Sequence, residues 1–345
     1  MGAHMVRYAV AAAIIAASAG GAAGAVSMPP PLEFKPLGAP ASLHADVGLS
    51  GPTGIVGNLI TNTVDLTTGG TIGAVYDRDT SAWTAIMVPS ASSTAAYGPA
   101  LTRSGYRIVG SYKRGPSTFA RDHAFFYDSA TKRYVTIDPP PSFCAPAKCD
   151  EAIAHSNFGD AAFKVVGNCD TLGAGPRRGG YSFTGHAFLY DSATASFTKI
   201  DVPGVVSTTA YGIWSDPGEV AVAGGFTDKH GTHGYVRGLM SGKMLVYNHR
   251  PAVVTHFEGI TGAGGAGDYN IAGDYVSVAG GEESGFFLPV RHWIAGKPVL
   301  LGTLSANSIY KRTVVGIRPV AQPTPRPTPP AMLNPIGFTV EVPGP

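Results

Sequence analysis

One short motif recurs six times along the 345 residues, and this repetition constrains the fold more than any other feature. Each copy has two apolar residues, a glycine, any residue and usually a further apolar or aromatic one, and neighbouring glycines are 43 to 57 residues apart. The copies are Ile55–Leu59, Ile108–Tyr112, Val165–Cys169, Val222–Phe226, Ile271–Tyr275 and Val314–Arg318. A period of this length is typical of repeat architectures in which each unit is one small sheet.

Three other short segments accompany the motif. A His-Ala-Phe segment follows it, most clearly at 123–128 and 186–191, then an Ile-Asp-x-Pro segment at 200–203, then an Ala-Tyr-Gly segment at 96–98 and 210–212. All are short, rich in β-branched and aromatic residues and bounded by Gly, Pro, Asp or Ser, as strands are. The sequence therefore predicts an all-β protein, a six-bladed β-propeller with four strands per blade. A β-sandwich of irregular repeats is the alternative.

The two ends of the chain suggest how such a ring would close. The last repeat stops after its third strand, at 336–342, while residues 32–38 supply a strand that belongs to no repeat. We expect this N-terminal strand to complete the last blade, because closure removes an exposed sheet edge. The proline-rich stretch 319–335 is expected to form an extended strap within that blade. Residues 26–345 would then form a single domain.

The first 25 residues have the pattern of a leader. Met1–Met5 looks vector-derived, and Arg7, the apolar run 8–17 and Ala23-Gly24-Ala25 are typical of a secretory signal peptide. The apolar run is shorter than the roughly 20 residues that span a bilayer, although an uncleaved anchor is the alternative. The sequence predicts a protein that is secreted, periplasmic or at the cell surface, without a transmembrane anchor after cleavage.

The composition limits the classes of partner and cofactor that the chain is expected to bind. Charged residues make up 14% of the chain and the net charge is +2, so no overall field selects nucleic acid. Hydrophobic residues make up 44%, enough for one large core. No phosphate-binding loop or dinucleotide fingerprint lies in a fitting context. We expect a monomer with no cofactor and no metal.

Residues 186–226, HAFLYDSATASFTKIDVPGVVSTTAYGIWSDPGEVAVAGGF, resemble the bacterial HAF-repeat extracellular proteins, which are named for their His-Ala-Phe triplet. Residues 123–139 are similar. The resemblance implies export and repeated β-structure. It carries no defined reaction, so it transfers no catalytic residue.

The histidines of these triplets occupy one register of the repeat. They are His123, His186 and His233. A residue that returns at one repeat position is expected to bond a neighbouring turn rather than to act on a substrate.

Departures from the repeat mark candidate sites, because binding residues gather where a rigid scaffold presents variable positions. Aligning the repeats places these residues at the Tyr position of the Ala-Tyr-Gly segment: Val47, Tyr97, Glu151, Tyr211 and Glu258. Glu151 and Glu258 at one channel could act as acid and base in polysaccharide cleavage by a glycoside hydrolase or lyase. Tyr97, Tyr211 and His256 would support them. Solvated channel residues without chemistry are the alternative.

Basic residues form a second departure, in the loops that lead from the fourth strand to the next blade and from the second strand to the third. They are Arg114, Arg121, Arg177, Arg178, His249 and Arg250. Arginine suits carboxylate and sulfate groups, and ordinary solubilising charge is the alternative. The main prediction is a binding module for carbohydrate or an anionic extracellular polymer on this face. The alternatives are a polysaccharide-active enzyme and a structural envelope protein.

Three cysteines allow at most one internal disulfide, which export permits. Cys144 and Cys149 lie in one loop and Cys169 ends a strand. The spacing does not suggest zinc. Of the two bridges from Cys169, the sequence favours Cys149–Cys169.

Overall fold

The computed structural model describes residues 31–115, 121–174, 181–279, 281–321 and 333–344. Within these ranges the protein is all-β, with one short 3-10 helix, η1 (Pro141–Cys144). The expected leader, residues 1–25, lies outside the described residues, as do Arg177 and Arg178. No helix in the described part of the chain has the length and apolarity needed to cross a membrane.

The strands form successive antiparallel units. The first is β2 (Val47–Val56), β3 (Leu59–Leu66), β4 (Thr71–Asp77) and β5 (Ala82–Ile86). The second is β6 (Ser93–Thr102), β7 (Gly105–Lys113), β8 (Asp122–Asp128) and β9 (Arg133–Thr136). The third is β10 (Glu151–Gly159), β11 (Phe163–Ala174), β12 (Tyr181–Asp191) and β13 (Ser196–Lys199).

A nine-stranded sheet holds the next two units. One contains β14 (Ser207–Asp216), β15 (Glu219–Asp228), β16 (Gly231–Gly238) and β17 (Met244–Tyr247). The other contains β18 (Val254–Gly265), β19 (Asp268–Val276), β20 (Glu283–Arg291), β21 (Ile294–Ala295) and β22 (Val299–Thr303), of which the last two both pair with β20. A single parallel pairing, Thr232 with Val254, joins the two units.

The last sheet combines the two ends of the chain. Its order is β1 (Phe34–Leu37), β25 (Leu333–Glu341), β24 (Thr313–Ala321) and β23 (Ser305–Tyr310), and Phe34 pairs with Val340. Pro319 pairs with Pro335, so both ends of the predicted proline-rich strap belong to strands, which corrects that expectation. The middle of the strap, 322–332, lies outside the described residues.

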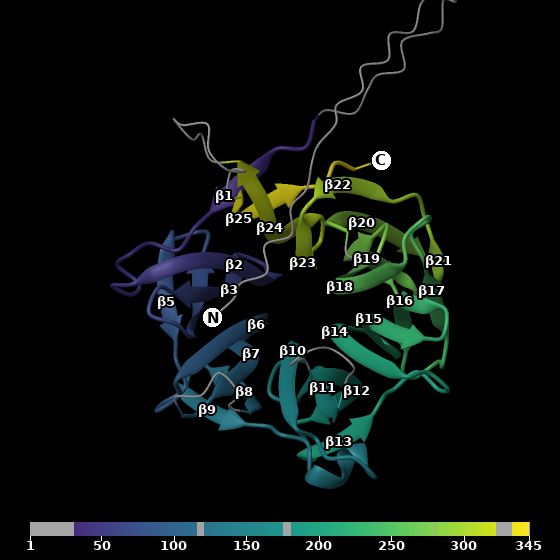
Figure 1. Cartoon of the computed structure of the whole chain (residues 1–345), viewed down its shortest axis with the longest axis horizontal. Coiled ribbons are helices and arrows are strands. Elements are labelled where there is room, and N and C mark those ends of the chain that lie inside the picture. The colour runs from purple at the N-terminus through teal and green to yellow at the C-terminus, as the bar shows by residue number, and fades with distance from the viewer. Residues whose placement is uncertain (1–30, 116–120, 175–180, 280, 322–332, 345) are drawn as a thin grey trace, which may run out of the picture.

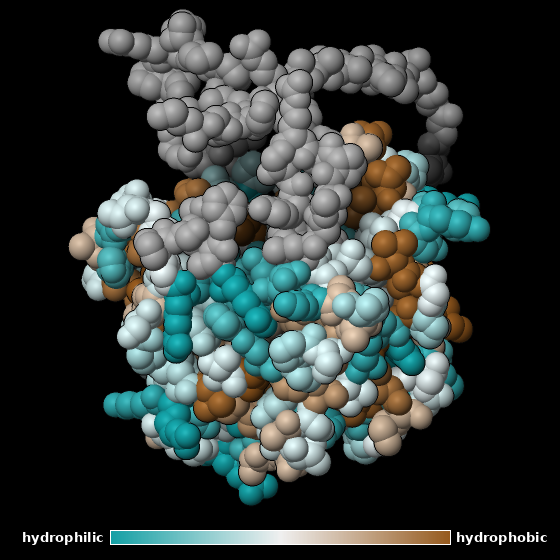
Figure 2. Space-filling view, turned by 60° about the horizontal axis from the view of Figure 1, so that its bottom comes forward, coloured by the Kyte–Doolittle hydropathy of each residue, from teal (hydrophilic) through white to brown (hydrophobic). Residues whose placement is uncertain are grey.

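The units follow one another around a common centre (Figure 1). The first strand of each unit lies nearest the centre, namely β2, β6, β10, β14, β18 and β23. The prediction of an all-β chain built from four-stranded antiparallel sheets is confirmed. On the face shown in Figure 2, apolar residues lie in small groups among hydrophilic ones.

The repeated glycine is explained by a bulge in the innermost strand. In five units the pairing register shifts directly after the residue opposite this glycine. A Cβ on Gly167 would lie 2.0 Å from the carbonyl oxygen of Ile153, and Gly110 and Gly224 show the same approach. Only glycine lets the second strand pass this close to the bulged strand.

The first copy of the motif, Ile55–Leu59, was placed in the wrong register. Gly57 lies in the turn between β2 and β3 with a φ of 57°. Asn62 pairs with Pro52 directly before the bulge and occupies the position of the repeated glycine. A tight turn and a bulge both favour glycine, so the local sequence alone did not distinguish them.

The aromatic ring of the two clearest His-Ala-Phe segments packs on the repeated glycine, Phe125 on Gly110 and Phe188 on Gly167. Phe188 pairs with Gly167, is fully buried, and would lie 2.7 Å from a Cβ there. In the same triplet, His186 Nδ1 lies 2.8 Å from Asp201 Oδ2, and Asp201 Oδ1 accepts a hydrogen bond from the Ala187 amide. This Asp belongs to the Ile-Asp-x-Pro segment. The structural role predicted for the repeated histidines is therefore confirmed at this position, and His123 repeats it with Asp138.

Substitution of Gly167 by alanine tests the bulge explanation. The new methyl group would overlap the Ile153 carbonyl, so we expect a loss of about 1–3 kcal/mol in the free energy of unfolding. Thermal and urea denaturation followed by circular dichroism would measure this. Gly38, around which a Cβ meets nothing within 4 Å, provides the matched control, and Gly38→Ala should change stability by less than about 0.5 kcal/mol. Equal stability of the two variants would contradict the explanation.

Candidate functional site

Six side chains enter the centre of the molecule, one from each innermost strand. At the bulge the pairing skips one residue in five of these strands and two residues, Tyr97 and Gly98, in β6. The residues that line the central cavity at these positions are Thr53, Tyr97, His155, Tyr211, Glu258 and Asn307. Ordinary strand residues alternate between the two faces of a sheet, whereas a bulge re-aims one side chain. We call these six residues the polar ring; the cavity that they line has a volume of about 270 Å³.

The residues of the polar ring differ from those that the sequence alignment predicted in two units, and they include a residue of a third unit that the alignment did not assign. Thr53 takes the position assigned to Val47, His155 takes that assigned to Glu151, and Asn307 fills the sixth unit. The alignment by residue type was displaced by several residues along these two strands, because only the strand pairing reveals which residue the bulge turns towards the centre. Nothing in the local sequence marks His155 as the residue that faces the centre. It follows Ala154 directly, and Ala154 pairs with the repeated Gly167.

His155 is held by a chain of hydrogen bonds. Its Nε2 lies 2.5 Å from Asn168 Oδ1, and Asn168 Nδ2 donates to Asp170 Oδ1 over 2.6 Å. Since the amide nitrogen faces the carboxyl, the amide oxygen faces the imidazole and accepts from Nε2. This assignment leaves Nδ1 as the hydrogen-bond acceptor of the ring. Burial lowers the pKa of His155 to about 4, so the imidazole is neutral at pH 7.

The two tyrosines of the polar ring pack on either side of this imidazole. The ring centroids of Tyr97 and Tyr211 lie 5.3 Å and 4.8 Å from that of His155. Burial raises the pKa of Tyr97 to about 12 and is also the main cause that raises the pKa of Tyr211. Both phenols therefore keep their protons at neutral pH and can donate hydrogen bonds.

Glu258 is the one carboxylic acid of the polar ring. Its side chain is 19% exposed, and burial, followed by the nearby carboxyls of Asp274 and Glu283, raises its pKa well above the usual value. Asp274 is itself buried and accepts hydrogen bonds from the Ala306 amide and the Ser305 hydroxyl. This environment favours the protonated, neutral form of Glu258. The polar ring thus presents hydroxyl, amide, imidazole and carboxylic acid groups.

Glu151 and His256 lie elsewhere. Glu151 begins β10, four residues before His155, and burial together with Asp122 raises its pKa. Of the described residues, the sets that line the central cavities include Glu258 but not Glu151. The structure therefore does not bring the two predicted glutamates together in one cavity. His256 Nδ1 lies 3.7 Å from Glu258 Oε1, and burial lowers the pKa of this histidine.

The described members of the predicted basic rim contact neighbours of their own. Arg114 lies over the ring of Tyr112 at 5.3 Å, Arg121 lies 3.8 Å from Asp138, and His249 packs on Tyr275 with ring centroids 4.0 Å apart. Arg250 is exposed. An anion-binding rim stays a prediction.

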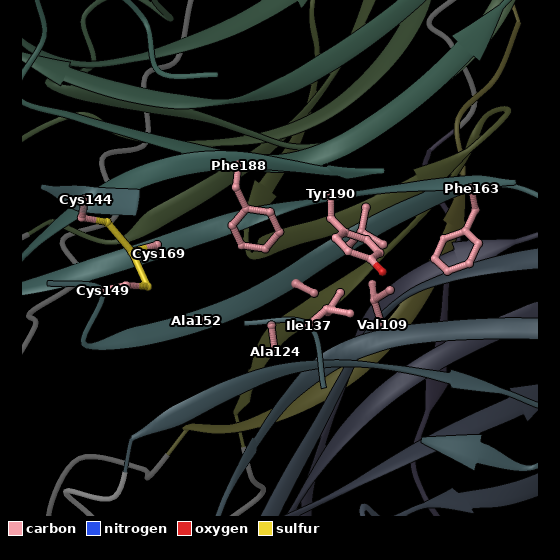
Figure 3. Close-up of a cluster of buried hydrophobic side chains, with 12 residues drawn as sticks. Val109, Ala124, Ile137, Cys144, Cys149, Ala152, Phe163, Cys169, Phe188 and Tyr190 are labelled. Atoms are coloured by element: carbon pink, nitrogen blue, oxygen red, sulfur yellow. A yellow bond between two sulfur atoms is a disulfide. The ribbon is translucent and has the colours of Figure 1, made fainter. Parts of the chain in front are cut away.

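The three cysteines meet at one end of a buried cluster (Figure 3). The Sγ atoms of Cys144 and Cys149 both contact Cys169 Sγ, but one sulfur can form only one disulfide. The Cα atoms of Cys149 and Cys169 are 5.4 Å apart, whereas those of Cys144 and Cys169 are 7.4 Å apart. Disulfides usually span about 4.4–6.8 Å between Cα atoms. The Cα distances favour the Cys149–Cys169 disulfide. When all three cysteines are reduced, their thiols form a set of soft donors that could bind a thiophilic cation.

Comparison with known proteins yields likenesses in fold alone. No protein-family model matches the chain, and no curated protein matches it. Among solved structures, the structure of YjhT has a TM-score of 0.46 at 11% identity, covering 85% of this chain and 97% of that one. The β-propeller domain of the Trilobed protease from Pyrococcus furiosus has a TM-score of 0.40 at 9% identity, covering 79% of each chain. A polysaccharide lyase of family PL25, an ulvan lyase, has a TM-score of 0.48 at 10% identity, covering 82% of this chain and 76% of that one.

Removal of individual cysteines tests the pairing. Closing the 20-residue separation between Cys149 and Cys169 should stabilise the fold by about 3 kcal/mol. Under oxidising conditions we expect Cys169→Ser to lose this stabilisation and Cys144→Ser to keep it. Peptide mapping without reduction should find Cys149 linked to Cys169. A Cys144–Cys169 peptide in the unmodified protein would contradict the assignment.

The environment of Glu258 predicts a pH-dependent stability. The pKa of Glu258 is higher in the folded protein than in the unfolded chain. As the pH rises from about 4.5 towards the raised pKa, the free energy of unfolding should therefore fall by about 1.4 kcal/mol per pH unit. Glu258→Gln keeps a neutral side chain and should be more stable than the unmodified protein at pH 8 but similar at pH 4. Glu33→Gln, at an exposed position, is the control in the same thermal denaturation series.

Proposed function

We propose that the chain is a six-bladed β-propeller whose ring is closed by its N-terminal strand. Two contacts between distant parts of the sequence support closure. β1 pairs with β25 along four residues, and Asn307 Nδ2 in the last innermost strand donates a 2.7 Å hydrogen bond to the carbonyl oxygen of Pro52 in the first. Six innermost strands, each with a bulge at the equivalent position, support the blade number.

We infer that this protein binds carbohydrate in the central cavity. The observation that carries the inference is the convergence of six polar side chains from six strands on one cavity. Burial shifts the pKa values of His155, Tyr211 and Glu258 in the direction that favours their uncharged forms. Neutral donors and acceptors beside aromatic rings suit a sugar, which offers hydroxyl groups and apolar C–H faces. The signal-like leader supports an extracellular ligand.

A polysaccharide lyase is the second candidate, favoured by the contact between His155 and Tyr211. In β-elimination, His155 Nδ1 would take the proton next to a uronic acid carboxyl and Tyr211 would give its proton to the departing sugar oxygen. Protonated Glu258 would donate a hydrogen bond to the uronic acid carboxyl. Absorbance of the unsaturated product, recorded for the protein and its Tyr211→Phe variant on a panel of uronic acid polymers, tests this activity.

Binding to a panel of neutral and acidic polysaccharides tests the first proposal. We expect Tyr211→Phe to weaken binding about threefold to tenfold, the value of one hydrogen bond. Glu258→Gln should stay within about threefold, because an amide replaces a neutral acid of the same size. Affinity electrophoresis and isothermal titration calorimetry provide the measurements.

Arg250→Ala is the control on the predicted basic rim. If binding is lost in Arg250→Ala and retained in Tyr211→Phe, the ligand lies on the loops and the central site is wrong.

A further inference from the structure

The polar ring occupies only part of the central channel. A second cavity, of about 290 Å³, shares Thr53, His155, Tyr211 and Glu258 with the first. Two cavities that share four wall residues are adjoining parts of one channel. The ligand of the polar ring can therefore extend into the second cavity.

The second cavity is lined mainly by apolar side chains, which we call the apolar collar. They follow the bulges in sequence, so they lie towards the turns that join the first and second strands of each unit. Its members include Ile55, Pro99, Phe158, Ile213, Trp214 and Ile309. Leu101, on the same wall, is 47% exposed. The collar thus reaches the surface on the face of these turns.

Trp214 is held in place within the collar. Its Nε1 donates a 3.0 Å hydrogen bond to Asp216 Oδ1, and its ring lies edge-to-face with Phe158 at 5.1 Å between centroids. An aromatic side chain already fixed by its neighbours loses little entropy when a ligand packs on it. The collar is therefore a preformed apolar site.

The opposite end of the channel has a different character. Glu151 comes four residues before the bulge in β10, whereas Phe158 comes three residues after it. The charges that act on Glu151 come from Asp122, Lys113 and Asp170 among others, and two of these three are acidic. An apolar group would be better accommodated by the collar than by this charged end.

We propose that the channel takes a glycoside whose sugar lies in the polar ring and whose apolar aglycone, an aryl or alkyl group, lies in the apolar collar. The ligand enters from the face of the turns between first and second strands, opposite to the predicted basic loops. This inference rests on the proposed carbohydrate function and specifies the class of carbohydrate. Burial of the aglycone supplies the additional affinity, since apolar area removed from water is stabilising.

Matched glycosides test the proposal. Methyl and phenyl β-glycosides of glucose, galactose and mannose are titrated into the full chain, and calorimetry and tryptophan fluorescence report binding. We expect at least one phenyl glycoside to bind about tenfold more tightly than its methyl partner, which corresponds to about 1.4 kcal/mol. Leu101→Ser, at the exposed edge of the collar, and Trp214→Leu should each reduce this ratio at least threefold while leaving the affinity for the methyl glycoside unchanged.

Val206→Ser, at a 63% exposed valine outside the collar-lining set, is the matched surface control and should keep the full ratio. Equal affinity for the phenyl and methyl partners, with both weakened in Tyr211→Phe, would overturn the role of the collar and leave the proposed carbohydrate function standing. A ratio unaffected by both collar variants would likewise overturn it. Failure of all six glycosides to bind would overturn the glycoside proposal, and failure of the polysaccharide panel as well would overturn the proposed carbohydrate function.

Discussion

The close approach between a glycine of the second strand and a carbonyl group of the bulged first strand is the constraint on which this structure depends. At Gly167 a Cβ would lie 2.0 Å from the Ile153 oxygen, and in five units the residue opposite the bulge is a glycine, with Asn62 in its place in the first unit. The phenyl ring of Phe188, from the third strand, packs on the same glycine. One repeated glycine thus joins three strands of a unit and turns one side chain towards the centre.

Burial then determines the chemistry of the side chains that the bulges present. Burial shifts the pKa values of three of them, Tyr97, His155 and Glu258, in the direction that favours the neutral form. The cause is that a charge inside the channel would lose its hydration. The neighbouring carboxyls of Asp274 and Glu283 strengthen this effect at Glu258. A set of neutral hydrogen-bonding groups beside the apolar collar is the basis of the proposal that the channel takes a glycoside.

Much of the architecture could be predicted from the repeats. The strand motifs, the four-stranded antiparallel units and the use of the segment around Phe34 as a strand all follow from patterns of glycine and apolar residues. The candidate site was predicted less well. The repeated segment correctly predicts three residues that line the cavity, Tyr97, Tyr211 and Glu258. In the third unit it predicts Glu151, whereas the residue that lines the cavity is His155. Glu151 lies four residues before His155 in the same strand, and alignment by residue type does not reveal which residue the bulge turns towards the centre, because that depends on strand pairing.

The sequence by itself determined the kind of element and its repetition, because alternation of apolar residues, turn residues and glycine are local properties of a chain. Tertiary structure alone decided which side chain of each innermost strand faces the centre, since that depends on strand pairing between residues far apart in sequence. It also decided the direction in which the pKa of Glu258 shifts, and it brings Cys149 to Cys169, the pairing that the sequence favours. These properties arise from burial and distance, and neither exists until the units are packed together.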